Sequence, residues 1–218
     1  MRELYGHPFS SYTWKAQIAL LEKEIPFTPR MIDGQHPDHI ATLREHWPLG
    51  KFPILLDRGR PVIESSIIIE YLDQEYPASR RLLPDNPQAA LAVRFMDRIF
   101  DNHVMTPVQA VVNEYLINRE TPDAARVKRA HGLLETIYAW LDERLDKDGW
   151  ACGEEFTLAD CVAAPSLFYA DWVRPINPSL VRLRGYRTRL LARPSVARCI
   201  EEARPYRPLF PLGAPDRD

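Results

Sequence analysis

The sequence contains only three cysteines in 218 residues. Cys152, Cys161 and Cys199 are odd in number, lie far apart and form no Cys-x-x-Cys pair. This pattern argues against a disulfide framework and against a zinc site built on cysteines. We therefore predict that all three are thiols of the core.

Metal and phosphate motifs are also missing. His36, His39 and His46 lie in a polar stretch, without the i, i+4 pair on a helix and the third ligand that a zinc site requires. No glycine-rich phosphate loop is present. We expect no metal site.

The chain has no marked charge excess and no long apolar run. Its 28 basic and 30 acidic residues leave a formal charge of -2, which gives no general attraction to nucleic acid. The arginines between Arg182 and Arg193 form a basic run that is typical of a solvated helix face. No signal-peptide pattern or bilayer-length segment occurs. We expect a cytoplasmic protein that binds neither nucleic acid nor a membrane.

The first 77 residues combine strand and helix patterns. A strand must end by His7-Pro8, because proline donates no backbone hydrogen bond and keeps its predecessor out of helical geometry. Trp14, Ile18 and Leu21 then recur at helical spacing, which leaves Lys15 outside the apolar stripe. Further elements are expected as a strand over 26–33, a helix around 38–44, a hairpin over 54–64 and a helix over 66–76.

Residues 78–87 are rich in proline and charge and predict a linker between domains 1–77 and 88–218. The second domain reads as helical throughout. A long helix over 88–118 should be kinked by Pro107. Its apolar side is expected to contain Phe95, Ile99, Phe100, Val104 and Val108. A helix over 124–145 follows, and Thr157 to Asp160 predicts a capping box at the start of another.

Two helix starts carry serines that have two interpretations. Ser10 and Ser11 could simply cap the first helix, or one hydroxyl could cap while the other contacts a bound anion. Glu64 and Ser65 could likewise only favour their helix start. Alternatively, Ser65 and the first-turn N–H groups would bind a ligand carboxylate while Glu64 binds a ligand ammonium group.

Four motifs, in order along essentially the whole chain, resemble the cytosolic glutathione transferase family. They are the serine-type turn from Tyr5 to Ser11, a stretch with Pro48, Gly50, Lys51 and Pro53 in which Trp47 replaces a common Asn, the Glu64-Ser65 pair, and the Thr157–Asp160 box. The resemblance implies an α/β thioredoxin-like N-terminal domain, an all-α C-terminal helical bundle and a homodimer.

By this resemblance the first domain binds reduced glutathione. The backbone of Phe52, before a cis Pro53, is expected to pair with its cysteinyl part. Glu64 and Ser65 are expected to hold its γ-glutamyl end, and Lys51 a carboxylate.

The resemblance assigns the glutathione sulfur to a serine hydroxyl. Ser10-Ser11-x-x-Trp14 is similar to a zeta-type stretch in which the first serine acts, which favours Ser10, with Ser11 as the alternative. Tyr12 replaces the cysteine of that stretch, so maleylacetoacetate isomerase activity is not implied.

An electrophile site is expected above Pro8, Phe9 and Tyr12. Its further candidates are Phe100, His103, Val104, Tyr115, Phe168 and Trp172. The resulting hypothesis is a glutathione transferase that conjugates glutathione to a hydrophobic electrophile. The alternatives are a non-catalytic carrier or interaction protein with the same fold, and a glutathione-dependent isomerase or peroxidase.

Overall fold

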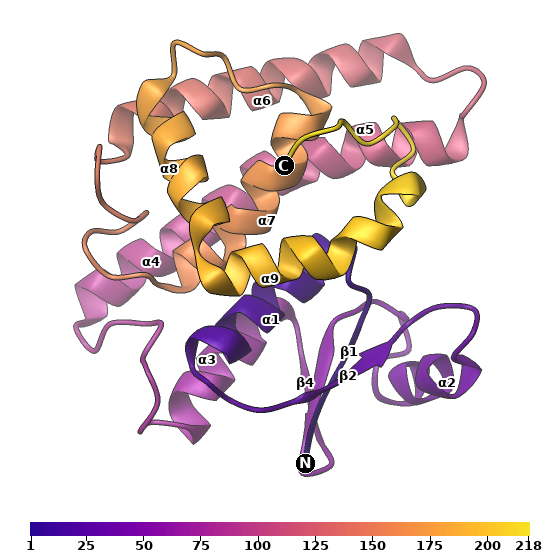
Figure 1. The fold of residues 1–218 in the computed structure, drawn as a ribbon, viewed down its shortest axis with the longest axis vertical. Coiled ribbons are helices and arrows are strands. Elements are labelled where there is room, and N and C mark those ends of the chain that lie inside the picture. Colours follow the sequence, from indigo (N-terminus) through magenta and orange to yellow (C-terminus); the bar gives the residue numbers. More distant parts are fainter.

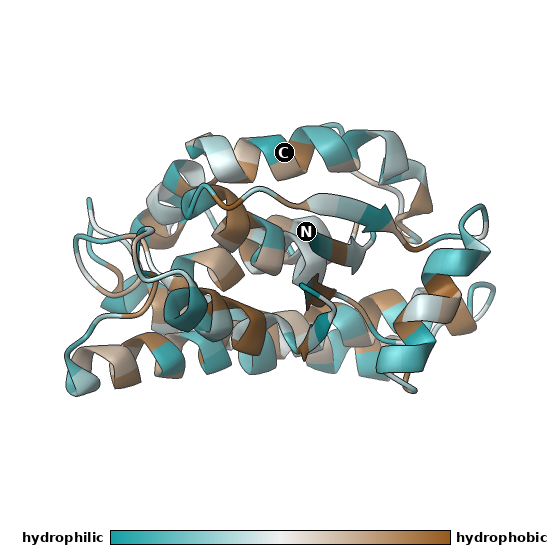
Figure 2. Ribbon diagram, turned by 90° about the horizontal axis from the view of Figure 1, so that it is seen from below, coloured by the Kyte–Doolittle hydropathy of each residue, from teal (hydrophilic) through white to brown (hydrophobic).

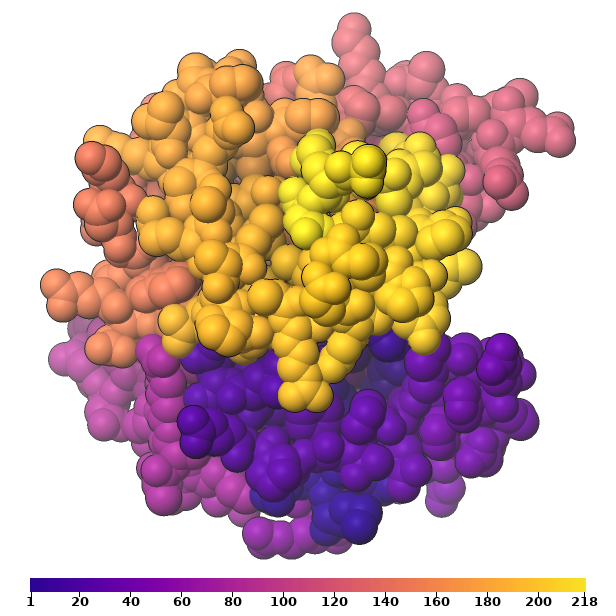
Figure 3. Space-filling model, viewed as in Figure 1, coloured from indigo at the N-terminus to yellow at the C-terminus, as the bar shows by residue number.

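The computed structural model describes residues 1–218 and contains two domains that pack closely together (Figures 1 and 3). The first domain has a four-stranded sheet of order β2-β1-β3-β4. Its strands are β1 (Arg2–Gly6), β2 (Thr28–Met31), β3 (Ile54–Asp57) and β4 (Arg60–Ile63). β1 runs parallel to β2 and antiparallel to β3, so the sheet is mixed.

Helices cover both faces of the sheet because consecutive strand residues point to opposite faces. They are α1 (Ser11–Glu22), α2 (Pro37–His46) and α3 (Ser65–Glu75). Tyr5 and Ile54 pack in a small cluster with Leu43 of α2. Leu4 and Leu55 belong instead to the main core, which includes α1 and α3. The sheet therefore lies between α2 and the α1–α3 pair.

The second domain is entirely helical. It contains α4 (Pro87–Ile99), the π-helical segment η1 (Phe100–Met105), α5 (Thr106–Ile117), α6 (Ala124–Arg144), α7 (Leu158–Val173), α8 (Val181–Ala192), α9 (Pro194–Ala203) and the 3₁₀ helix η2 (Arg204–Leu209). Every residue of α7 is buried, and this helix packs against α1, α4 and α8. Hydrophobic residues gather on the inward-facing sides of the surrounding helices (Figure 2).

The predicted thioredoxin-like domain followed by a helical domain is confirmed, with some local differences. The expected long helix over 88–118 is interrupted by η1, just before Pro107. Proline has no N–H to give to a helical carbonyl, and the Thr106 N–H bonds back five residues to the Asp101 carbonyl. Phe95, expected on the apolar side, is 51% exposed and lies beside Trp140 instead. No helix is both long and apolar enough to cross a membrane.

The capping box at the start of α7 is confirmed. The Asp160 carboxylate accepts hydrogen bonds from the Thr157 N–H at 2.8 Å and the Thr157 hydroxyl at 3.1 Å. It also accepts from the Ala151 N–H at 2.9 Å and from the Tyr186 hydroxyl at 2.6 Å. These four bonds satisfy a carboxylate with no solvent exposure, as a buried charge requires.

Lys15 lies off the apolar stripe of α1, yet its side chain is completely buried. Its Nζ lies 2.5 Å from Asp97 Oδ1 and 2.8 Å from Asp101 Oδ2, and it donates to Ser66 Oγ at 2.7 Å. Arg98 donates to both carboxylates and to Ser66. We call these five residues the Lys15 cluster. It joins α1, α3 and the α4–η1 segment through charges that balance.

Replacing Lys15 by Met should lower the free energy of unfolding by about 3–5 kcal/mol near neutral pH, because it leaves two buried carboxylates with Arg98 as their one remaining cation. Burial already raises the pKa of Asp101, and Lys15 opposes that rise. Without Lys15 the folded state holds protons that the unfolded state releases, so the variant's stability should fall as pH rises. Urea unfolding at pH 5 and pH 8 measures this.

The matched control is Lys128→Met, since Lys128 is an exposed lysine of α6. We expect it to change stability by less than about 0.5 kcal/mol. A Lys15→Met variant that lost equally little, with no added pH dependence, would contradict the role given to the Lys15 cluster.

Candidate active site

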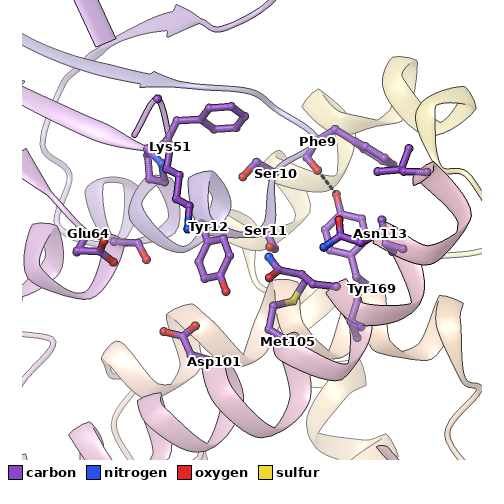
Figure 4. Close-up of a pocket in the computed structure, with 18 of the residues that line it drawn as sticks. Phe9, Ser10, Ser11, Tyr12, Lys51, Glu64, Asp101, Met105, Asn113 and Tyr169 are labelled. Carbon is purple, nitrogen blue, oxygen red and sulfur yellow. Dashed lines mark hydrogen bonds between the residues drawn. The ribbon is translucent and has the colours of Figure 1, made fainter. Parts of the chain in front are cut away.

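A cleft of about 810 Å³ opens between the two domains. Its first wall is the turn from β1 into α1. Its second wall is formed by the segment before β3 together with the start of α3. Its third wall is one face of α4, η1 and α5 (Figure 4). Tyr169 of α7 and the chain after η2 complete it. The predicted glutathione-site residues Ser10, Ser11, Lys51, Phe52, Pro53, Glu64 and Ser65 all line this one cleft.

The β1–α1 turn is held by bonds from both domains. The Trp14 indole N–H donates to the Pro8 carbonyl at 2.5 Å, and the Tyr169 hydroxyl donates to the Phe9 carbonyl at 2.9 Å. His7 Nδ1 accepts from the Phe9 N–H at 3.0 Å, and burial lowers the pKa of His7, which favours the neutral ring that this bond requires. The turn is therefore fixed before any ligand arrives.

Gly6 explains how the strand can approach the helix so closely at this turn. A Cβ at Gly6 would lie 2.5 Å from Thr13 Oγ1, which itself accepts from the His7 N–H at 3.3 Å. A larger residue would push α1 away from β1. The small residue is thus required by the contact that closes the turn.

The two serines occupy different positions. Ser10 has extended backbone and is the N-cap of α1, and its Oγ accepts from the Thr13 N–H at 3.3 Å. This capping bond uses only a lone pair, so the hydroxyl proton of Ser10 stays available for another acceptor. Ser11 is the first residue of α1 and is 8% exposed. Both hydroxyls lie at the cleft, and either could donate to an anion.

On the second wall, the Phe52–Pro53 peptide bond is cis, as predicted. Lys51 beside it is exposed, Phe52 is half-buried and Pro53 is buried. Glu64 has φ 72° and ψ 121°, and it precedes α3 without a side-chain capping bond. Its carboxylate is exposed and forms no ion pair. Ser65, the next residue, is buried. This exposed carboxylate and the free N–H groups of α3 together suit a ligand that carries an ammonium and a carboxylate group.

The third wall differs from the electrophile site that was expected. Phe9 and Tyr12 do line the cleft, but Phe100, His103 and Val104 do not. Phe100 and Val104 are fully buried in the core, and His103 faces solvent. Of the other candidates, Tyr115 lies in a separate groove and Phe168 and Trp172 pack in the core.

The helix face that lines the cleft is offset from the predicted one. It consists of Arg98, Asp101, Asn102, Met105, Val108, Gln109, Val112, Asn113 and Leu116. These positions recur every three or four residues from Arg98, so helical spacing could have found them if the orientation of the helix had been known. Burial raises the pKa of Tyr12, which faces them, to about 12.

Two family models match the chain. Residues 4–80 match the N-terminal domain of glutathione S-transferases, and residues 124–192 match the C-terminal domain. The first match covers the sheet with its three helices, and the second lies within the helical domain. Each half of the chain is therefore identified separately.

Two proteins that are similar in sequence to this chain carry different protein names. A stringent starvation protein A homolog from Coxiella burnetii is 30% identical over 165 residues, which cover 76% of this chain and 74% of that one. The glutathione S-transferase hmp2 of Hypomyces subiculosus is 27% identical, with 90% of both chains covered.

Glutathione S-transferases also occur among the solved structures that are similar to this one. A glutathione S-transferase from Methylobacillus flagellatus, crystallised with glutathione bound, superposes with a TM-score of 0.80 at 25% identity, over 91% of this chain and 98% of that one. FzlA from Caulobacter crescentus shares the fold, with a TM-score of 0.77 at 22% identity over 92% of each chain. With both of its domains matched in this order and its relatives covering most of its length, this chain belongs to the glutathione S-transferase family.

Proposed function

We propose that this protein is a glutathione transferase, which binds reduced glutathione, stabilises its thiolate and conjugates it to an electrophilic small molecule. The observation that carries the proposal is the meeting of three motifs in one cleft: the serine turn, the cis Pro53 segment and the Glu64-Ser65 pair. The relative crystallised with glutathione supports the same ligand.

In this proposal each part of glutathione has its own contacts. The Phe52 backbone pairs with the cysteinyl part, and Lys51 attracts a carboxylate. Glu64 binds the γ-glutamyl ammonium, while the Ser65 hydroxyl and the N–H groups of α3 bind the adjacent carboxylate. The sulfur then lies at the start of α1, near Ser10 and Ser11.

A serine hydroxyl can supply most of the thiolate stabilisation. A thiol with a pKa of about 8.5 is mostly protonated at neutral pH, and lowering that pKa by about two units takes about 2.7 kcal/mol. A hydrogen bond to a charged acceptor contributes about 1.5–3 kcal/mol, whereas an exposed helix dipole contributes about 0.3–1 kcal/mol. Ser10 is the favoured donor, and Ser11 is the alternative.

The principal alternative is a protein that keeps this fold as a carrier or interaction module. The names of two relatives, a stringent starvation protein A homolog and an FtsZ-localized protein A, do not mention glutathione. However, a pure scaffold has no need for the unpaired Glu64 carboxylate or for the Ser10-Ser11 turn. Isomerase or peroxidase activity would use the same thiolate on a different co-substrate.

Reduced glutathione and unpaired thiols point to the same compartment. Cys161 and Cys199 are buried and Cys152 is half-buried, and none of the three is paired. The proposal therefore keeps the cytoplasm, where glutathione maintains thiols in the reduced state.

The proposal includes a homodimer. Three apolar side chains are exposed on α3 and α4, namely Ile67, Leu91 and Phe95, at 52%, 60% and 51%. The ion pair between Arg94 and Glu70 fixes the two helices that carry them, with bonds of 2.9 and 2.7 Å. This α3–α4 surface is the face that we assign to the partner subunit.

Removing each serine hydroxyl in turn tests its role at the glutathione sulfur. In the wild type, the thiol of bound glutathione should ionise below its ordinary pKa of about 8.5. Replacing the donating serine by Ala should raise that pKa by about one to two units and slow conjugation near neutral pH by roughly 10- to 100-fold. Ultraviolet thiolate absorbance against pH, for wild type, Ser10→Ala and Ser11→Ala, measures the shift.

Each serine variant serves as the control for the other, since both remove one hydroxyl from the same turn. Ser10→Ala should also lose about 1 kcal/mol of stability through its capping bond, and urea unfolding measures that separately. Glutathione that binds with an unshifted thiol, or does not bind, would favour the carrier or scaffold.

A further prediction concerns the dimer. Phe95→Glu should convert a two-chain species into a monomer, because a symmetric interface would hold two copies of the new charge near one apolar contact. Sedimentation equilibrium gives the mass. Leu133→Glu, at an apolar residue 54% exposed on α6, is the control and should leave the dimer intact. A monomeric wild type would rule out the homodimer.

A further inference from the structure

The side chain of His7 holds the backbone just before the two serines. Its Nδ1 accepts a hydrogen bond from the Phe9 N–H at 3.0 Å. The backbone of the same residue is bonded on both sides, because its N–H donates to Thr13 Oγ1 at 3.3 Å and its carbonyl accepts from the Ser10 N–H at 2.9 Å. One residue therefore bonds to Phe9, to Ser10 and to the first turn of α1.

The bond from the His7 ring has the form of an Asx turn. In such a turn the side-chain oxygen of Asn or Asp accepts from the backbone N–H two residues later. A histidine can take this part only while Nδ1 has a free lone pair, so the ring must be neutral with its proton on Nε2. A protonated ring would instead point an N–H at the Phe9 N–H, and the bond would be lost.

Two titratable groups from other elements lie near the His7 ring. The ring of Tyr206 in η2 lies with its centroid 4.8 Å away at an interplanar angle of 71°, and its hydroxyl donates to Met31 Sδ of β2 at 3.6 Å. Asp33 lies in the turn after β2. Burial lowers the pKa of His7, and the charge of Asp33 opposes this shift. The ring is therefore neutral at pH 7 and takes up its proton below its ordinary pKa of about 6.5.

The other side-chain bonds to this turn do not change in the same pH range. The Tyr169 hydroxyl donates to the Phe9 carbonyl at 2.9 Å (Figure 4), and burial raises the pKa of Tyr169 well above its ordinary value. The Trp14 indole N–H, which holds the carbonyl of the residue before Phe9, does not titrate. Protonation of His7 thus releases one specific bond, one residue before Ser10.

We propose that His7 is a positioning residue for Ser10, and that loss of its ring bond on protonation weakens the contact between Ser10 and the glutathione sulfur in mild acid. The inference rests on the proposed function. It adds to that function the group that holds the donating hydroxyl in place, and a pH dependence that is separate from the ionisation of the thiol. His7 transfers no proton in the reaction and acts only through the turn.

Two substitutions separate the acceptor from the ring. His7→Phe keeps an aromatic ring beside Tyr206 but has no acceptor for the Phe9 N–H, whereas His7→Asn supplies an oxygen that forms an ordinary Asx turn. We expect His7→Phe to raise the thiol pKa of bound glutathione by about one unit and to slow conjugation near neutral pH by roughly three- to tenfold. His7→Asn should leave the thiol pKa within about 0.3 units and the rate within about twofold of the wild type. Ultraviolet thiolate absorbance measures the pKa.

The pH profile gives a second readout that a merely structural role would not change. With a chlorodinitrobenzene as the electrophile and saturating glutathione, kcat/KM in the wild type requires that both the thiol and His7 have lost a proton. The plot of log kcat/KM against pH should therefore fall in acid with a slope that approaches about two. In His7→Asn only the thiol titrates, and the slope should stay at about one.

Nuclear magnetic resonance makes the test independent of turnover. In the ligand-free wild type, the backbone amide shifts of Phe9 and Ser10 should change with the same midpoint as the His7 ring, and in His7→Asn they should show no such change. His103→Phe is the matched control, since His103 of η1 is exposed and lies outside the cleft. It should alter neither the thiol pKa nor the slope. Urea unfolding of each variant checks that it is folded.

The outcomes separate the two proposals. If the wild type binds no glutathione, the proposed function is wrong and the inference fails with it. If the wild type lowers the thiol pKa, but His7→Phe keeps that pKa and the amide shifts do not follow the ring, only the role of His7 is overturned. An equal rise of the thiol pKa in His7→Asn would assign the effect to the ring contact with Tyr206, which also overturns the inference.

Discussion

The buried ammonium group of Lys15 is the contact on which the geometry of the cleft depends. Lys15 belongs to α1, whose start carries the two serines, and it binds Ser66 in the first turn of α3, just after Glu64 and Ser65. It also pairs with Asp97 and Asp101, and Asp101 lines the third wall. Three walls from two domains are thus joined at one charge, and burial makes the geometry of such a cluster demanding.

Apolar patterns predict the order of the elements, the family resemblance predicts the cis Pro53, and a local spacing predicts the Thr157–Asp160 capping box. The first depends on apolar periodicity, and the last on a spacing of three residues within one helical turn. The cis bond was predicted from the family resemblance of the surrounding motif. In each case the determining atoms lie close in sequence, or the motif itself carries the information.

Errors arose where the partner is distant in sequence. Lys15 is buried against Asp97 and Asp101. The apolar periodicity of α1 cannot show this, because these partners lie more than eighty positions later in the chain. Phe100 and Val104 are expected at the cleft but lie in the core. The sequence pattern of a long helix shows which residues share a face, but not which way that face is turned. Asp101 and Met105 of the π-helical segment face the cleft instead.

Backbone conformation gives an independent reason to treat Glu64 as functional. Two other non-glycine residues have positive φ, namely Glu24 at 53° and Arg58 at 54°. Glu24 follows the end of α1 and Arg58 forms the β3–β4 turn, where a left-handed residue is ordinary. Glu64 combines φ 72° with ψ 121°, which is outside that left-handed region and costs about 1–3 kcal/mol. Its side chain makes no capping bond to offset this cost. A strained residue whose carboxylate faces an open cleft is explained if that carboxylate binds a ligand.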